Sequence, residues 1–339
     1  MEIRKLQKIK GGSFTLSLPK QWVQSRKLES GEQIAVEEEE DGSLRISPIG
    51  AAFERPLEVT LRLEDYSSLR ALEYCVATYY IQGSNRITIT SQKIMSAEQK
   101  KRLKQVRTEL PGVEVGEEEA NRLSFQVMID PATFSLESLL EKASAFSLRL
   151  QEDAVKSLVE WNPPLAKEVQ ERSGEAQRHY RVMIRQVAVA SLSRNIADKI
   201  GVRNCQECVT FALVARDLSR LVYHSSSIAR HVLMLQAKRK VDSEILKAIG
   251  LMSEIAYEMQ HNAATAFLKK DVKLAVSVLN KMDEIREKEE ALLKSVMEKV
   301  KDVDTAITLS IIARDLRRIA GYAVAVADDA MNRVLTPIA

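Results

Sequence analysis

Alternating apolar and polar positions predict several short strands in the first 50 residues. A short strand is expected at Ser13–Ser17, after a basic strand and a Gly-Gly turn. Pro19 fits the first turn of a short helix. Two further strands, at Gln33–Glu37 and Leu44–Ser47, flank the pair Asp41-Gly42. That dipeptide between alternating segments predicts a β-hairpin.

A second pattern, over residues 55–130, mixes strand-like alternation with helical spacing. The expected order is strand, helix, strand, helix, strand, strand, and Ser96 is the expected N-cap of the second helix. The segments are Leu57–Leu63, Ser67–Ile81, Arg86–Thr90, 96–110, Val113–Val115 and Leu123–Ile129. This order predicts a small sheet with helices on one face.

The rest of the chain has the pattern of long helices. No proline occurs between Leu165 and Thr336, and proline inside a helix costs about 3 kcal/mol. Six helices are expected, at about 135–161, 165–197, 205–238, 241–269, 272–300 and 303–335. Helices of this length and number predict bundle packing.

Composition narrows the class of protein. Lys+Arg 50 against Asp+Glu 47 give 339 residues a net charge of only +3, so the position of the charges matters more than their sum. Three cysteines do not form a disulfide framework, which favours a reducing compartment. No apolar run reaches the roughly 18 residues that span a bilayer, and the N-terminus lacks a signal-peptide core. We therefore expect a cytoplasmic protein.

The helical half contains an internal repeat. Residues 210–220 match residues 308–318 at an offset of 98, with six of eleven positions identical and a shared A-R-D-L-x-R core. A weaker match joins Leu165-Ala166 to Leu274-Ala275 at an offset of 109. Two three-helix units, 135–238 and 241–335, are the expected result.

These repeats, each containing A-R-D-L-x-R followed by small residues, resemble the PhoU family of phosphate-uptake regulators. The resemblance covers about 200 residues and implies two tandem three-helix bundles. The first 50 residues resemble the AbrB/SpoVT swapped-hairpin DNA-binding domain, through Gly12–Trp22, Leu28–Glu32 and Asp41–Leu44. The pairing of the two is similar to archaeal PhoU-like regulators with an N-terminal DNA-binding module.

The expected fold is therefore an α+β N-terminal part followed by an all-α part. It consists of an AbrB-like β module at 1–50, a small α+β domain of unknown role at 55–130, and PhoU-like bundles at 135–238 and 241–335.

The chain departs from the PhoU family at its metal-binding positions. That family binds metal clusters through acidic residues four apart on facing helices. None of the eight corresponding residues is acidic here: Ser173, Gln177, Ser219, Tyr223, Met282, Arg286, Arg317 and Gly321. The acidic pairs Glu171/Glu175 and Asp283/Glu287, one register away, are more simply a solvated helix face. We predict no metal site and no cofactor.

Charge is segregated in the first 41 residues. The predicted DNA-contacting residues are Arg4, Lys5, Lys8, Lys10, Lys20, Arg26 and Lys27, against Glu2 alone in residues 1–27. Seven acidic residues then follow between Glu29 and Asp41. A cationic face of this kind suits phosphate contacts and doubles on dimerisation. The other interpretation is a solvated strand and helix surface.

A second basic cluster lies on the expected helix 96–110, at Lys100, Lys101, Arg102, Lys104 and Arg107. It is interpreted either as an exposed helix face packed on a sheet or as an auxiliary DNA or anion contact.

Other reactive side chains indicate structure rather than catalysis. The C-x-x-C of Cys205 and Cys208 lacks a second pair for zinc and does not follow a βαβ pattern. No aspartate or cysteine accompanies the histidines at catalytic spacing, and the nucleotide and hydrolase motifs do not occur. The Arg216-Asp217 and Arg314-Asp315 pairs suit interhelix contacts, with partner docking as the other interpretation. We expect no enzymatic activity.

The function that follows is a DNA-binding transcriptional regulator, of phosphate uptake by resemblance. It is expected to be a homodimer that contacts double-stranded DNA in upstream regions, and its helical bundles sense a ligand or bind a partner. The alternative is a signalling adaptor that docks a phosphate transporter or sensor protein without binding DNA. A metal- or phosphate-storage protein is a third hypothesis, opposed by the eight non-acidic positions.

Overall fold

The computed structural model describes residues 3–9, 11–38, 42–49, 57–130, 133–235 and 241–335, and it divides into two units. The first unit, up to residue 55, has the order strand, strand, helix, strand, strand. Strand β1 (Gln7–Lys8) pairs antiparallel with β2 (Phe14–Thr15), and β3 (Ile34–Glu38) pairs antiparallel with β4 (Leu44–Pro48). Helix α1 (Lys20–Ser25) lies between the two pairs along the chain.

Some details of this unit differ from the predictions. The strand expected at Ser13–Ser17 is only two residues long. Pro19 takes the N-cap position with extended backbone (φ −61°, ψ 126°) and is not within the helix. Asp41 of the expected turn lies outside the described residues, whereas Gly42 has φ +77°, as a tight turn requires.

The second unit begins with the α+β part. Its elements are β5 (Glu58–Arg62), the 3₁₀ turn η1 (Leu63–Asp65), α2 (Leu69–Ile81), β6 (Arg86–Thr90), α3 (Ala97–Glu109), β7 (Val113–Glu118) and β8 (Arg122–Val127). The sheet order is β5-β6-β8-β7, with β5 parallel to β6 and the other pairs antiparallel. Ser96 caps α3 in a capping box with Gln99, which confirms the predicted N-cap.

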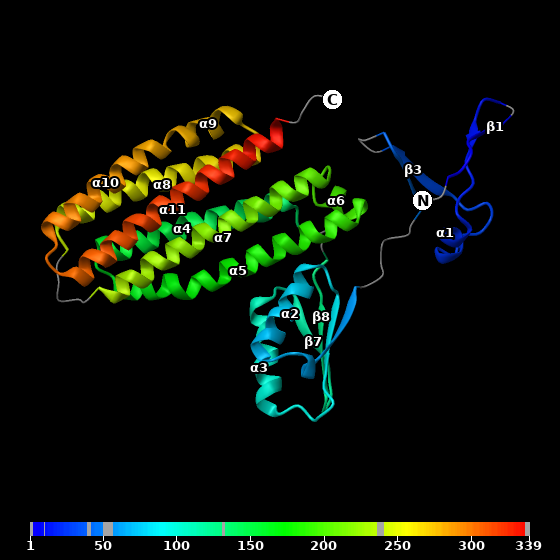
Figure 1. Ribbon diagram of the computed structural model, residues 1–339, viewed down its shortest axis with the longest axis horizontal. Helices are drawn as coiled ribbons and strands as arrows, with labels where there is room; N and C mark the ends of the chain where they lie inside the picture. The colour runs from blue at the N-terminus through cyan, green and yellow to red at the C-terminus, as the bar shows by residue number, and fades with distance from the viewer. Residues whose placement is uncertain are drawn as a thin grey trace. The chain divides into compact units, whose positions relative to one another are not determined.

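Both helices of this part pack on the same face of the sheet. Ile87 and Ile89 of β6 lie beside Phe125 and Leu123 of β8 and are fully buried. They share one hydrophobic core with α2 and α3. The opposite face carries the polar side chains of Thr88 and its partner Ser124. Figure 1 shows the helices on one side of the strands.

Eight helices make up the described residues of the rest of the unit. They are α4 (Leu136–Val159), α5 (Pro163–Leu192), α6 (Arg194–Lys199), α7 (Cys205–Met234), α8 (Ser243–Lys269), α9 (Val272–Asn280), α10 (Met282–Lys299) and α11 (Val303–Val334). Two predicted helices are divided. The segment 165–197 breaks at Ser193, which is extended, and the segment 272–300 breaks at Lys281, which keeps helical backbone angles. Helix α5 starts before residue 165 because Pro163 and Pro164 fit its first turn.

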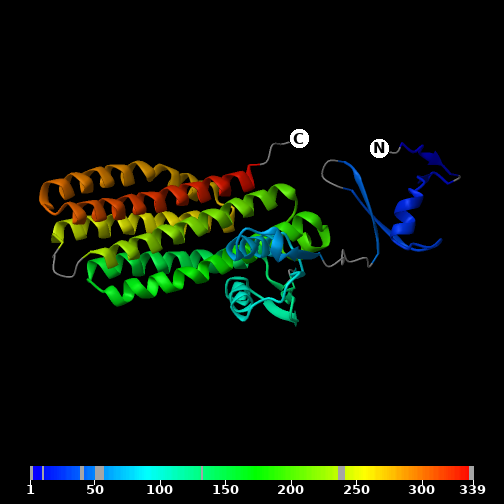
Figure 2. The ribbon, with the colours of Figure 1, turned by 60° about the horizontal axis from the view of Figure 1, so that its bottom comes forward.

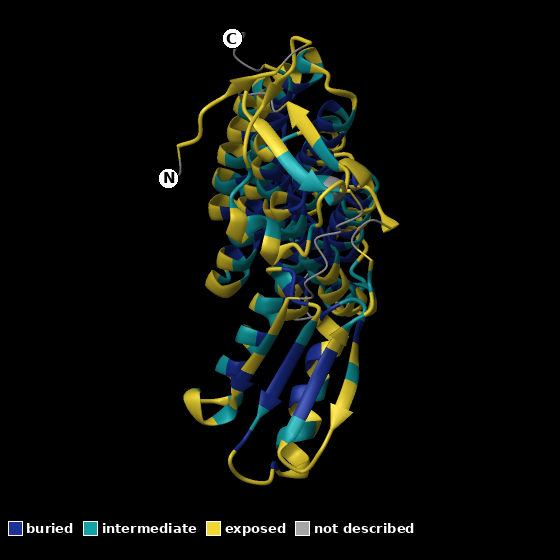
Figure 3. Ribbon diagram, turned by 90° about the vertical axis from the view of Figure 1, so that its right-hand side faces the viewer, coloured by how far each residue is buried: buried dark blue, intermediate teal, exposed yellow. Residues whose placement is uncertain are grey.

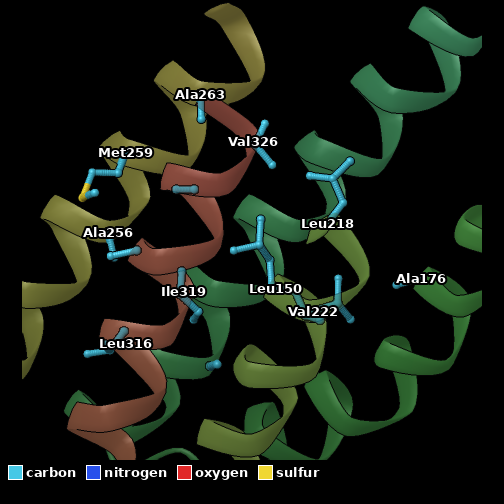
Figure 4. Close-up of a cluster of buried hydrophobic side chains, with 14 of the residues drawn as sticks. Leu150, Ala176, Leu218, Val222, Ala256, Met259, Ala263, Leu316, Ile319 and Val326 are labelled. Carbon is cyan, nitrogen blue, oxygen red and sulfur yellow. The ribbon is translucent and has the colours of Figure 1, made fainter. Parts of the chain in front are cut away.

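The helical part has a single hydrophobic core. Helices α4, α7, α8 and α11 contact one another around it, while α5 lies on one side and α9 with α10 on the other (Figures 1 and 2). Figure 4 shows leucine, isoleucine and valine side chains of these helices meeting between the ribbons, with Leu150, Leu218 and Ile319 among them. None of the described helices combines the length and apolar character needed to cross a membrane.

An approximate two-fold axis relates the two repeats. Gln260 lies 109 residues after Gln151, and the two side chains are hydrogen-bonded. Tyr322 lies 98 residues after His224, and their rings stack with centroids 5.7 Å apart. Direct contact between residues at equivalent positions occurs where a two-fold axis passes. The two repeats therefore face each other across one shared core.

Helix α5 joins the α+β part to the helices through a buried arginine. Arg185 is 2% exposed. Its Nη1 donates to the carbonyl oxygens of Tyr80 and Ser84 at 2.5 and 2.9 Å, and its Nη2 donates to Asn85 Oδ1 at 2.9 Å. The guanidinium also lies 4.9 Å from the Tyr80 ring centroid. Burial lowers the pKa of Arg185, so these acceptors are what stabilise the charge.

The substitution Arg185→Met tests this contact between α5 and the α+β part. It leaves the Ser84 carbonyl oxygen and Asn85 Oδ1 without the Arg185 donor, while the Tyr80 carbonyl oxygen keeps the Gly83 N–H. We therefore expect a loss of about 3 kcal/mol in the free energy of unfolding. Amide exchange in the Tyr80–Asn85 turn should also accelerate. The control is Arg181→Ala, which removes a more exposed ion pair with Glu109 and should cost less than about 1 kcal/mol. Equal losses in the two variants would contradict this role of Arg185.

Candidate functional site

The predicted DNA-contacting residues lie at the surface of the first unit. Arg4, Lys5, Lys8, Lys20, Arg26 and Lys27 are all exposed, and Lys10 lies outside the described residues. Lys8 belongs to β1, Lys20 is the first residue of α1, and Arg26 and Lys27 directly follow that helix. These side chains therefore lie at the surface, along the β1 segment and at both ends of α1.

The same unit leaves its apolar side chains uncovered. The register of β3 and β4 pairs Val36 with Ile46 and Ile34 with Pro48, so one face of the hairpin is apolar except for Glu38 opposite Leu44. Val36 and Leu44 on that face are 56% and 65% exposed, and Phe14 of β2 is 60% exposed. In the described part of this unit no residue is buried, and Figure 3 shows its strands in the colours of exposed and intermediate residues only.

The basic cluster on α3 is largely neutralised by neighbouring acids. Ion pairs join Lys104 to Glu118 at 2.6 Å and Arg102 to Glu73 at 2.7 Å. Lys100 and Arg107 lie within 4.0 Å of Glu118 and Glu114, respectively. A groove of about 590 Å³ runs along these lysines. The pairing favours the interpretation of α3 as an exposed helix face packed on a sheet.

At the positions that the resemblance assigns to metal binding in the first repeat, neutral side chains join α5 to α7. Gln177 Nε2 donates to Ser219 Oγ at 3.3 Å. Ser226 Oγ donates to Ser173 Oγ at 3.2 Å, and Gln170 Nε2 donates to Ser226 Oγ at 2.9 Å. The predicted positions thus face each other, but they offer a cation no negative charge.

The second repeat differs from the first at these positions. Arg317 Nε lies 2.7 Å from Glu289 of α10, and Arg286 Nη1 lies 2.7 Å from Asp283. Within the ranges that the structure describes, no group of three or more histidine, cysteine or acidic side chains gathers in a way that could hold a metal ion.

Buried acidic side chains line the contact between α7 and α11. The repeated aspartates Asp217 and Asp315 are 1% and 4% exposed, and Asp329 is 5% exposed. His224 Nδ1 lies 2.9 Å from Asp315 Oδ1, which is the expected interhelix contact. Arg216, in contrast, pairs at 2.8 Å with its own neighbour Asp217 and not across the bundle. Sequence reasoning missed the role of His224, although its equivalence to Tyr322 at offset 98 was available.

The carboxyl group of Asp329 has a raised pKa. Burial is the main cause, and the charges of Asp217 and Asp328 add to it, so the pKa of Asp329 rises to about 7. Burial likewise raises the pKa of Asp217. The α7–α11 contact therefore changes its charge near neutral pH.

Four arginines of the duplicated motif lie exposed on the same two helices. Arg216 and Arg220 belong to α7, and Arg314 and Arg318 belong to α11. Arg220 lies one turn before His224, and Arg318 lies one turn before Tyr322, so the two flank the stacked pair on the two-fold axis. We call these four residues the arginine row.

A second buried arginine ties four helices together. Arg333 of α11 is 5% exposed, and its guanidinium lies beside the rings of Phe211 and Phe267, 4.9 Å from each centroid. Its guanidinium donates to Glu207 Oε1 of α7 at 3.1 Å, to the Phe267 carbonyl oxygen of α8 at 3.1 Å and to Glu137 Oε1 of α4 at 2.5 Å. Sequence reasoning gave no sign of this contact.

Glu207 remains ionised in spite of its burial. Burial raises the pKa of Glu207, but hydrogen bonds from Arg203 and Arg333 outweigh that cost and lower it to about 2. Glu207 stands between Cys205, which is exposed, and Cys208, which is buried.

Comparisons with known proteins concern the helical part. Residues 249–330, about a quarter of the chain, match the PhoU domain family. A Thermotoga maritima protein named "Phosphate-specific transport system accessory protein PhoU homolog 1" is 25% identical over 214 residues, covering 58% of this chain and 86% of the relative. The helical part is thus PhoU-like.

Two solved structures are also similar. The phosphate transport system regulatory protein PhoU from Streptococcus pneumoniae is 17% identical with a TM-score of 0.48, covering 57% of this chain and 91% of that one. PhoU from Pseudomonas aeruginosa is 19% identical with a TM-score of 0.48, covering 58% and 93%. At such scores these two likenesses carry no further argument.

Asp329 predicts a pH dependence of stability. A carboxyl whose pKa is raised on folding favours the folded state fully below its unfolded pKa, near 3.8, and that contribution is lost as the pH rises through about 7. The difference in the free energy of unfolding between Asp329→Asn and the native chain should therefore shift in favour of the variant by about 3 kcal/mol as the pH rises from 5 to 8. Thermal or urea unfolding across this range measures the effect. Asp304→Asn, at an exposed position in the first turn of the same helix, is the control, and parallel curves for Asp329→Asn and the native chain would refute the assignment.

Proposed function

We propose that this chain is a regulator of phosphate transport that binds DNA as a homodimer through its first unit. The helical part senses a ligand or binds a partner and thereby adjusts the binding of DNA. The PhoU-like character of the helices and the name of the Thermotoga maritima relative support the phosphate connection. We propose no enzymatic reaction for the chain.

The absence of buried side chains in the described first unit carries the proposal. A chain of about 50 residues buries a small share of its surface and is only marginally stable by itself. Its β3–β4 hairpin exposes an apolar face, with Val36 56% and Leu44 65% accessible. A second copy of the same unit would cover this face, as the resemblance to swapped-hairpin domains implies. Dimerisation would then explain why these apolar residues are exposed in a single copy.

The exposed basic residues supply the second half of the proposal. Lys5, Lys8 and Lys20 are exposed and carry the charge that phosphate groups require. A dimer presents each of them twice, which doubles the number of phosphates that one molecule can neutralise. The expected partner is double-stranded DNA in upstream regions, with phosphate contacts providing most of the affinity.

The alternative is an adaptor that docks a phosphate transporter or sensor protein and binds no DNA. The arginine row favours it, because the duplicated motif exposes Arg216, Arg220, Arg314 and Arg318 on two adjacent helices. Exposed arginines near an exposed aromatic residue, Tyr223 at 51%, are typical of interfaces with acidic partners.

DNA binding is tested with the triple variant Lys5→Gln, Lys8→Gln and Lys20→Gln in the full chain. Fluorescence anisotropy on random and upstream duplexes across a salt series gives the slope of log affinity against log salt. Each lost phosphate contact should reduce the magnitude of that slope by about 0.9. A dimer loses three contacts in each subunit, so the magnitude of its slope should fall by about 5. The control carries Lys167→Gln, Lys247→Gln and Lys288→Gln, three exposed lysines of the helical part. If the native chain binds no DNA at low salt, the adaptor is the better hypothesis.

Self-association is tested with Val36→Asp. A charge on the apolar face of the hairpin should weaken the dimer at least tenfold, because the charge would have to be buried in the interface. Sedimentation velocity over a concentration series measures the change. Ser47→Asp places the same charge on the opposite face of the hairpin and should leave the dimer intact. A native chain that is monomeric at every concentration would overturn this part of the proposal.

A further inference from the structure

Two cysteines in the first turn of α7 have contrasting surroundings. Cys205 is the first residue of the helix and is exposed, whereas Cys208 is 5% exposed and belongs to the hydrophobic core. Asn204 caps the helix through its side chain, which accepts from the Glu207 N–H at 2.9 Å. The proposed role in phosphate transport and the proposed binding of DNA do not involve these two cysteines.

The two positions are suitable for a disulfide bond. Side chains three residues apart on a helix are neighbours, with Cβ atoms about 5–6 Å apart. A disulfide requires about 3.5–4.5 Å, so the turn must tighten for the bond to close. The first four N–H groups of a helix have no partner within the helix, which makes this turn the easiest one to adjust.

Their reactivities are also complementary. Cys205 is exposed at the first position of the helix, so an external disulfide can reach its sulfur. Burial raises the pKa of the Cys208 thiol, and the neighbouring Cys205 and Glu207 raise it further. Cys205 is thus suited to attack an external disulfide, and Cys208 is suited to resolve the product from inside.

We propose that Cys205 and Cys208 form a reversible intramolecular disulfide, with a low-molecular-weight disulfide such as glutathione disulfide as the oxidant. The Cys205 thiolate attacks one sulfur of that molecule, and the first glutathione leaves as a thiolate that takes up a proton. Cys208 then loses its proton and attacks the Cys205 sulfur, which releases the second glutathione. Two protein thiols lose two electrons in total, and one glutathione disulfide gains them.

The position of Glu207 gives the bond a structural consequence. Glu207 lies between the two cysteines and holds Arg333 and Arg203 through its carboxylate. Tightening the turn displaces that carboxylate, and Arg333 is buried with Glu137 as its remaining acidic partner. Oxidation at the start of α7 therefore weakens the contact that joins α4, α7, α8 and α11.

The experiment equilibrates the full chain in glutathione buffers of increasing oxidised fraction, followed by alkylation and peptide mass analysis. The expected product is a Cys205–Cys208 disulfide, about 2 Da lighter than the dithiol peptide, while Cys75 forms no internal bond. Cys208→Ala should accumulate glutathione on Cys205, and Cys205→Ser should leave Cys208 unmodified. Free thiols at both positions under fully oxidising conditions, or a lasting adduct on Cys205 in the native chain, would overturn the proposal.

A second measurement tests the coupling to Arg333. Oxidation should lower the Tm of the native chain by several degrees, and it should lower the Tm of Glu207→Gln by much less. The same variant also reports on folding, since its circular dichroism in the reduced state must remain helical. Equal shifts in the two proteins would show that the disulfide does not act through Glu207 and would overturn the coupling.

Discussion

The helical part depends on a core that neither repeat can complete alone. Helices α4 and α7 of the first repeat pack on α8 and α11 of the second, and the aromatic rings of Phe211 and Phe267 meet edge to face across that boundary with centroids 5.3 Å apart. Burial of apolar surface is the dominant favourable term in folding. Since the buried surfaces of the two repeats face each other, we expect neither three-helix unit to be stable in isolation. The contacts at the ends of the bundle and on the two-fold axis all rest on this packing.

Buried polar groups mark where the repeats have diverged. An exact duplication would place the same residue on both sides of the axis, as Gln151 and Gln260 still are. His224 and Tyr322 are equivalent positions with different chemistry, so Asp315 has a histidine partner whereas its equivalent Asp217 pairs with Arg216 beside it. One consequence is a second oxygen on each aspartate that is buried without a partner. Such groups cost stability, and the arginines and histidine nearby limit that cost.

The sequence predicts local features better than contacts between distant segments. The repeated A-R-D-L-x-R placed equivalent positions of the two repeats in register. The Ser96 cap was also predictable, because its partners lie within three residues. Arg185 and Arg333 were not predictable. Their acceptors lie about 100 and 126 residues away along the chain, and no local pattern distinguishes a buried arginine from a solvated one. The two-residue strands β1 and β2 were overestimated for a related reason, because alternation predicts a strand only where a partner covers one face.

The two units differ in how far they bury their apolar side chains, and this difference bears on function. The helical part covers most of its large apolar side chains in one internal core, although some, such as Val209 and Met297, remain exposed. The first unit keeps both its apolar and its basic residues exposed, with Phe14 and Val36 each more than half accessible. Apolar side chains require another protein surface, whereas clustered cations require an anion. A polyanion alone would leave the apolar face in water, and a second copy alone would bring like charges together. A dimer bound to a polyanion meets both requirements at once, which is why the proposal combines self-association with DNA binding.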